Sequence, residues 1–175
     1  FVMAKPVDMD TLPDPYQGIS AITIDDIRWR YCYIKATTLL ANVLAKQSAL
    51  EQDASEAILI RDGNALEGAA SNLFIVKDNN IITPPKSENL LPGITRDVIL
   101  ELANNHDLVV TESNISLDEL TNADEIWLTS SIKEVVPVVT LDNQPVANGH
   151  PGEQWKKMKL LYEDFKKSLS SKPSH

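Results

Sequence analysis

The sequence predicts a mixed α+β fold in which a barrel-like, mixed β-sheet is surrounded by helices. Three features predict it: short apolar runs separated by tight-turn residues, helical segments between these runs, and no regular alternation of strand and helix of the kind that builds a doubly wound parallel sheet. The chain has 175 residues, 43% of them hydrophobic and 23% charged, which is enough for one well-buried domain.

Residues 1–18 are rich in proline and are predicted to be a linker, with the domain itself over residues 19–171. Residues 21–35, AITIDDIRWRYCYIK, are rich in β-branched and aromatic side chains and predict one long strand that carries Lys35 at its inner end. The next segment, residues 37–52, has apolar residues at helical spacing behind a threonine pair that is available as the N-cap, and it predicts a helix.

The remainder of the chain alternates between turns and short regular elements. Residues 56–85 contain apolar runs separated by Asp-Gly-Asn and Asp-Asn-Asn, which is typical of consecutive antiparallel strands joined by tight turns. Six further elements are predicted: a glycine-led helix and then a strand over 93–113, a short helix capped by Ser116, a strand over 125–130, a hairpin over 134–147 that turns at Asp142-Asn143, and an amphipathic helix over 152–171.

Charge and composition exclude several classes of function. The formal net charge is −9, from 25 acidic and 16 basic residues, so no basic stripe is available for nucleic acid or an anionic membrane. An anionic ligand must therefore be held by local donors such as a helix N-terminus. The sequence also has no GxSxG, GxGxxG or GxxxxGK[ST] motif, which leaves hydrolase, Rossmann and P-loop functions unsupported.

Cysteine and histidine usage indicates neither disulfides nor a metal site. Cys32 is the single cysteine and the three histidines are scattered, so no internal disulfide and no metal-ligand spacing is present. The sequence also lacks an apolar run long enough to cross a bilayer, and FVMAKPVDMD has no signal-peptide pattern. We therefore expect a cytoplasmic protein.

Lys35 is the first candidate for chemistry. It follows an aromatic segment and precedes an apolar helix, where desolvation would favour the neutral amine that attacks carbonyl groups. The alternative, a lysine whose stem packs while its amine reaches water, is the commoner one for a lysine judged by residue type alone.

Three further segments hold candidate ligand-binding residues. Glu67 lies in LEGAASN, where small neighbours allow a flat ligand to approach the backbone, although a solvated loop glutamate is an alternative. In LLPGITRD, Gly93 precedes a helix whose first amides suit an anion, although these residues also suit an ordinary helix start. In LTSSIKE, three consecutive hydroxyl groups offer uncharged donors to a phosphate, or form an ordinary polar turn.

Taken in order, four segments resemble the C-terminal domain of class IV (fold type IV) pyridoxal-phosphate aminotransferases: YIKATTLLANVLAKQ, EAILIRDGNALEGAASNLFIV, LLPGITRDVILELA and DEIWLTSSIKEVVPV. The resemblance covers about residues 19–165, nearly the whole chain. Within the family, DDIRWRYCYIK, the TPP of residues 83–85 and GEQWKKMKLLYEDF are most similar to D-amino-acid aminotransferases. Branched-chain aminotransferases and aminodeoxychorismate lyase share the same pattern.

The resemblance implies a role for each matching residue. Lys35 would bind pyridoxal 5′-phosphate covalently and move the substrate proton, while Glu67 would pair with the pyridine nitrogen of the cofactor. Leu91 would pack on a face of the cofactor ring, and Arg28 would lie near its phenolic oxygen.

The phosphate of the cofactor would be bound by the other two segments. The resemblance implies that the backbone amides of Ile94 and Thr95 bind it, with help from Ser130 and Ser131. Two positions depart from the family pattern, because Ala70 stands where a close relative has serine and Ser131 stands where threonine is usual. These changes put the outer hydrogen bonds of the site in doubt, but not the main roles.

The implied reaction is transamination between an amino acid, such as D-alanine, and a 2-oxo acid. The resemblance also implies a smaller N-terminal domain that is absent from this chain, and a homodimer that completes the site. We therefore expect the chain to be the cofactor-carrying C-terminal domain, with little activity by itself. The alternatives are aminodeoxychorismate lyase, a branched-chain aminotransferase, or a non-catalytic binding domain that uses the same fold.

Overall fold

The computed structural model describes residues 14 and 16–170, so most of the predicted linker lies outside the described residues. The strands are β1 Ile19–Asp25, β2 Glu56–Arg61, β3 Asn64–Gly68, β4 Asn72–Lys77, β5 Asn80–Thr83, β6 Val110–Glu112, β7 Ile115–Ser116, β8 Glu125–Ser130, β9 Glu134–Leu141 and β10 Gln144–Pro145. The helices are α1 Leu40–Leu50, α2 Ile94–Asn105, α3 Leu117–Thr121 and α4 Glu153–Ser170.

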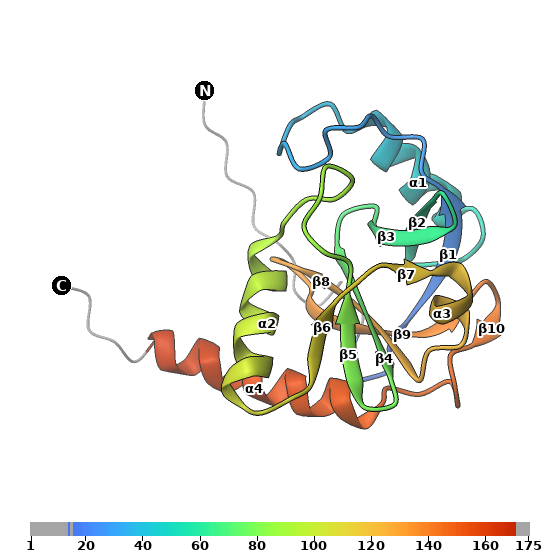
Figure 1. The fold of residues 1–175 in the computed structure, drawn as a ribbon. Helices are drawn as coiled ribbons and strands as arrows, with labels where there is room; N and C mark the ends of the chain where they lie inside the picture. The colour runs from blue at the N-terminus through green and yellow to red at the C-terminus, as the bar shows by residue number, and fades with distance from the viewer. Residues whose placement is uncertain (1–13, 15, 171–175) are drawn as a thin grey trace.

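The sheet closes on itself, which confirms the predicted barrel-like mixed fold (Figure 1). Around the ring the order is β4, β8, β9, β1, β2 and β3, and β3 pairs with β4 again. β1 runs parallel to both of its neighbours, β2 and β9, while the other pairs of the ring are antiparallel. Closure of the ring leaves its strands without free edges.

Tight turns join the antiparallel strands as predicted. The two central residues of each two-residue turn have positive φ, as this type of hairpin turn requires. These residues are Asp62 and Gly63 between β2 and β3, Asp78 and Asn79 between β4 and β5, and Asp142 and Asn143 between β9 and β10. The predicted meander and C-terminal hairpin are therefore confirmed.

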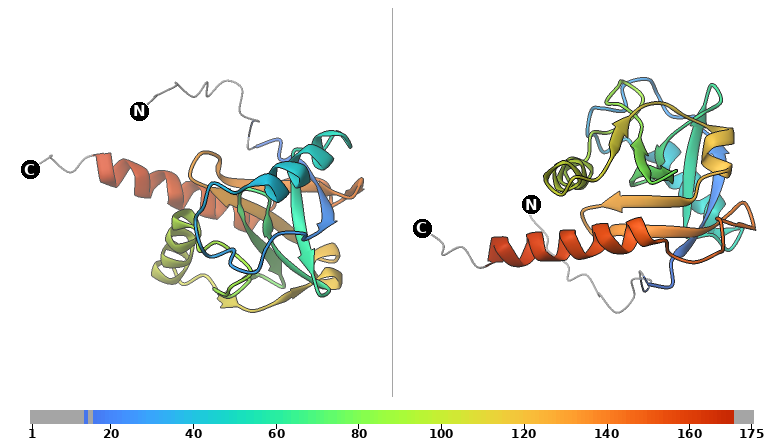
Figure 2. Two further views of the ribbon diagram at one scale, coloured as in Figure 1. Left: turned by 90° about the horizontal axis from the view of Figure 1, so that it is seen from above. Right: turned by 60° about the horizontal axis from the view of Figure 1, so that its bottom comes forward.

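Two apolar layers pack on the two faces of the barrel wall. Within β4, Leu73 and Ile75 belong to the cluster inside the barrel, whereas Phe74 and Val76 pack in the cluster that includes side chains of α2 and α4. Figure 2 shows α2 and α4 together on one side of the barrel. A strand buried on both faces carries a continuous apolar run, which explains the sequence NLFIVK of this strand.

The long strand predicted over residues 21–35 is wrong. β1 ends at Asp25, and residues 26–39 form an irregular loop before α1. The chain turns because the buried Asp26 carboxylate accepts a hydrogen bond from the Arg28 backbone amide at 3.0 Å and pairs with two arginines. Trp29 and its aromatic neighbours consequently point away from the core and are about half exposed.

The helix predicted over residues 37–52 exists but is shorter, Leu40–Leu50, and the threonine pair does not cap it. Leu39 occupies the N-cap position instead, and its amide bonds to the Thr37 carbonyl. The helix packs on the barrel through Ala45 and Ala49, while its larger apolar side chains face outward.

The other helices agree with the prediction. α3 has a complete capping box, in which Ser116 and Glu119 exchange hydrogen bonds. The N-terminus of α4 is held by the Glu125 carboxylate, which accepts from the amides of Gln154 and Trp155. Within the described residues no helix has the length and apolar character needed to span a membrane.

Candidate cofactor site

A cavity of about 900 Å³ lies between the loop of residues 26–39, the β3–β4 turn, the start of α2 and the end of β8. All eight residues that the sequence singled out line it: Arg28, Lys35, Glu67, Leu91, Ile94, Thr95, Ser130 and Ser131. Its volume is in the range of pockets that hold small molecules and cofactors. The four segments are distant in the sequence, and the fold brings them to one place.

Glu67 lies at the floor of this cavity and is buried. Its carboxylate accepts hydrogen bonds from Arg28 Nη1 at 2.5 Å, from the Leu91 amide at 3.1 Å and from Asn72 Nδ2 at 3.2 Å. Burial raises the pKa of Glu67 to about 7, although Arg28 and the Leu91 amide favour the ionised form. A cationic group in the cavity would favour the ionised form further.

Lys35 lies on the same cavity. The prediction that it stands at the end of a strand is wrong. It belongs to the loop of residues 26–39, and its side chain is exposed among the described residues. The expected desolvation of its amine is therefore not provided by the described residues.

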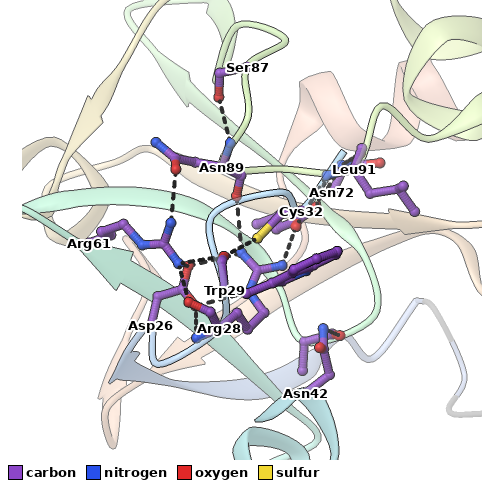
Figure 3. A network of polar contacts seen from close by, with 12 residues as sticks. Asp26, Arg28, Trp29, Cys32, Asn42, Arg61, Asn72, Ser87, Asn89 and Leu91 are labelled. Atoms are coloured by element: carbon purple, nitrogen blue, oxygen red, sulfur yellow. Dashed lines mark hydrogen bonds and ion pairs between the residues drawn. The ribbon is translucent and has the colours of Figure 1, made fainter. Parts of the chain in front are cut away.

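Arg28 connects the cavity to a buried ionic network (Figure 3). Its side chain contacts the carboxylates of both Asp26 and Glu67. Burial opposes the charged form, but these two carboxylates raise the pKa of Arg28. Burial likewise opposes the charge of Asp26, yet its bonds with Arg28 and its attraction to Arg61 hold the pKa of Asp26 below its usual value.

The start of α2 forms one wall of the cavity. Gly93 is the N-cap, and no side chain caps the helix, so its first amides are available to an anion. A Cβ atom on Gly93 would lie 2.2 Å from Asn72 Oδ1, so the helix start and the β4 strand meet here without room for a side chain. Ile94 and Thr95 follow directly and line the cavity.

Hydroxyl groups without a partner also face this region. Thr129 and Ser71 line the cavity, and their buried hydroxyl oxygens have no hydrogen-bond partner within the part of the chain that the structure describes. Thr129 is only 1% exposed. Buried polar atoms are normally satisfied, so these two indicate room for a polar ligand.

Sequence reasoning missed Asp26, Arg61 and Asn72. Thr129 was included as the first of the three hydroxyl groups of LTSSIKE, but the resemblance implied a role only for Ser130 and Ser131. Asn72 ends the LEGAASN segment, but no spacing rule relates it to Leu91, whose carbonyl it binds at 2.7 Å. The contact of Asp26 with Arg61 joins positions far apart in the chain, which a sequence pattern does not show.

An exposed apolar surface borders the cavity on the loop of residues 26–39 and on α1. The large side chains that it exposes are Ile27, Trp29, Tyr31, Tyr33, Ile34, Leu39, Leu40, Val43 and Leu44. Monomeric proteins rarely expose so many large apolar side chains together. No cluster of residues that could bind a metal ion occurs among the residues described.

The chain belongs to the class IV aminotransferases. Residues 2–141 match the family model of amino-transferase class IV, and the match includes every residue placed around the cavity.

Individual proteins that are similar to this chain in sequence or structure are also aminotransferases. The chain is 44% identical over 147 residues to a D-alanine aminotransferase of Bacillus licheniformis, which covers 84% of the chain and 52% of the relative. A putative branched-chain amino acid aminotransferase of Thermotoga maritima has a similar structure, with a TM-score of 0.80, 30% identity, and coverage of 89% of this chain and 57% of that one. An aminotransferase of Brucella abortus, solved bound to the co-factor PLP, gives a TM-score of 0.75 at 25% identity over 85% of this chain and 54% of that one. The chain spans about half of the length of the curated relatives it matches.

Proposed function

We propose that this chain is the cofactor-holding part of a pyridoxal-phosphate-dependent aminotransferase that acts on a D-amino acid such as D-alanine and on a 2-oxo acid. The observation that carries the proposal is the cavity itself, which collects a lysine, a buried carboxylate and an uncapped helix N-terminus around one space. The lysine offers an amine that can react with a carbonyl group, the carboxylate can pair with a ring nitrogen, and the helix N-terminus offers hydrogen-bond donors for a phosphate.

The residues present fit pyridoxal phosphate. The amides of Ile94 and Thr95, with the hydroxyl groups of Ser130 and Ser131, would bind the phosphate without adding net charge. The unpartnered Thr129 hydroxyl lies beside them on the cavity wall. When bound, the cofactor supplies an electron sink for the bonds of the substrate Cα.

The remaining roles are those that the resemblance implies, and they are supported by the position of each residue on the cavity. Glu67 would keep a proton on the ring nitrogen, and Leu91 would cover one face of the ring. Lys35 would bind the cofactor through its amine and, once released by the substrate, move the proton of the substrate Cα as base and acid. Arg28 would hold Glu67 in place and lie near the phenolic oxygen.

The substrate and the assembly are supported less directly. The 44% identity to a D-alanine aminotransferase supports a D-amino acid, whereas the 30% identity to a solved structure named as a branched-chain enzyme supports the second candidate. The exposed apolar surface beside the cavity supports an N-terminal domain and a second subunit that cover it. A cytoplasmic location is supported by the free thiol of Cys32.

The test is covalent trapping of the cofactor. The chain is incubated with pyridoxal phosphate, reduced with borohydride and analysed by peptide mapping, beside the variants Lys35→Ala and, as a matched control, Lys86→Ala. We expect one adduct on Lys35, its loss in Lys35→Ala and its retention in Lys86→Ala. Labelling spread over the surface lysines would contradict the cofactor site and favour a non-catalytic binding domain. A panel of D- and L-amino-acid donors, tested on the intact enzyme, then separates the two candidate substrates.

A further inference from the structure

Asp26 is a buried carboxylate that has no assigned role, and it lies behind the cavity rather than on it. Its side chain is fully buried, and its backbone amide bonds to the Ile60 carbonyl at 2.8 Å, which keeps it beside β2 directly after β1 ends. Two cations meet at this carboxylate, Arg28 Nε at 2.9 Å and Arg61 Nη2 at 2.8 Å. A buried carboxylate without such partners would be strongly unfavourable.

The two oxygens of Asp26 occupy one edge of the Arg28 guanidinium. Oδ1 accepts from Nε, and Oδ2 accepts from Nη2 at 3.0 Å. A guanidinium is planar and rigid, so fixing this edge fixes the direction of the remaining nitrogen. That nitrogen, Nη1, is the one that contacts Glu67.

The same network also binds the loop that carries Leu91 (Figure 3). Arg61 Nη1 donates to Asn89 Oδ1 at 2.8 Å, and Arg28 Nη2 donates to the Asn89 carbonyl at 3.1 Å. Two residues further on, the Leu91 amide bonds to Glu67. Asp26 therefore stands at the junction of the two loops that meet at the Glu67 carboxylate.

We propose that Asp26 is a positioning residue, which holds the Nε and Nη2 edge of Arg28 and thereby aims Nη1 at Glu67. It touches neither the cavity nor a ligand, and it acts through Arg28. Its importance for catalysis rests on the proposed function, but its effect on Glu67 does not require a cofactor.

The substitution Asp26→Asn separates positioning from simple charge. Asparagine keeps the shape but turns one acceptor into an NH₂ donor, which faces the donors of Arg28 and Arg61 and breaks the two-point hold. The charged groups that act on Glu67 are Arg28 at contact distance and Asp26 behind it, with Lys35 on the same cavity. Loss of the Asp26 charge alone would lower the pKa of Glu67, whereas loss of the Arg28 contact would raise it.

The experiment is a carbon-13 NMR titration of glutamate side-chain carboxyls in the full chain without cofactor, with the Glu67 signal assigned by its loss in Glu67→Gln. We expect Asp26→Asn to raise the pKa of Glu67 by about one unit. The matched control is Asp25→Asn, which removes the same charge from the exposed neighbouring residue and should leave the Glu67 titration unchanged. A lowered or unchanged pKa in Asp26→Asn would overturn the proposal.

A second variant covers the case in which Asp26→Asn does not fold. In Arg28→Lys a single ammonium replaces the planar guanidinium and cannot bind Asp26 on one side while it contacts Glu67 on the other. The pKa of Glu67 should therefore rise, as in Asp26→Asn. An unchanged value in this variant would equally overturn the proposal. Borohydride trapping on Lys35 is measured in parallel, so a missing adduct with a shifted Glu67 titration contradicts the proposed function alone.

Discussion

Replacing Gly93 by alanine tests whether the cavity depends on the close contact between the start of α2 and Asn72. The φ of Gly93 is −74°, so alanine fits the backbone, and the cost arises where the added Cβ would lie 2.2 Å from Asn72 Oδ1. Asn72 must then move and lose its bonds to Glu67 and to the Leu91 carbonyl. With roughly 1 kcal/mol for a neutral hydrogen bond and more for one to a charged group, we expect Gly93→Ala to lower the unfolding free energy by about 2 kcal/mol.

Urea unfolding of a double-mutant cycle provides the assay and its control. Asn72→Ala removes both atoms that a Cβ on Gly93 would meet, so in that background Gly93→Ala should cost less than about 1 kcal/mol, the remaining effect of alanine at an N-cap. The coupling between the two substitutions should therefore be of the order of 1 kcal/mol or more. Additive effects, with coupling within about 0.5 kcal/mol of zero, would refute the steric reasoning.

Three further predictions concern pH and the helix ends. Folding raises the pKa of Glu67 from 4.5 to about 7, so the folded state binds more protons than the unfolded state between these two pH values. Protonated Glu67 therefore contributes about 3 kcal/mol to the unfolding free energy. This contribution is present below pH 4.5 and is lost as the pH rises through 7. Urea unfolding at several pH values should show that Glu67→Gln lacks this decline. Gly152→Ala should lower the melting temperature, because its Cβ would lie 2.1 Å from the Glu125 carboxylate that caps α4; an unchanged value would contradict this. Ser116→Ala should cost about 1 kcal/mol in urea unfolding through loss of the cap on Glu119, and a neutral effect would show that α3 does not need it.

The local signals in the sequence were sufficient for most elements. The turn at Asp62-Gly63 and the capping box at Ser116 depend on neighbouring residues only, and both were predictable from them. The end of β1 was not predictable in this way, because the alternation of apolar residues continues past Asp25. What ends the strand is the burial of Asp26 against Arg61, and that contact joins the loop after β1 to strand β2 of the folded sheet.

The candidate site was predictable as a set of residues but not as an arrangement. Motif order identified Lys35, Glu67 and the start of α2, and the fold places all three on one cavity. The contacts of Glu67 with Arg28 and Asn72 depend on how the loop after β1 and the strand β4 meet in space. The parallel pairing of β1 with both neighbours is likewise a tertiary property that no single segment encodes.

Glu67 and Asn72 have a second importance, because they form the register pair that joins β3 to β4 and closes the barrel. Beyond this pair, the backbone link at this junction is the bond from the Gly68 amide to the Ser71 carbonyl. The pairing of β3 with β4, at the cavity, is therefore the shortest in the ring. Loss of this pairing would convert the barrel into an open sheet while the other strand pairings persist. Closure of the barrel and the shape of the cavity thus depend on the same few atoms.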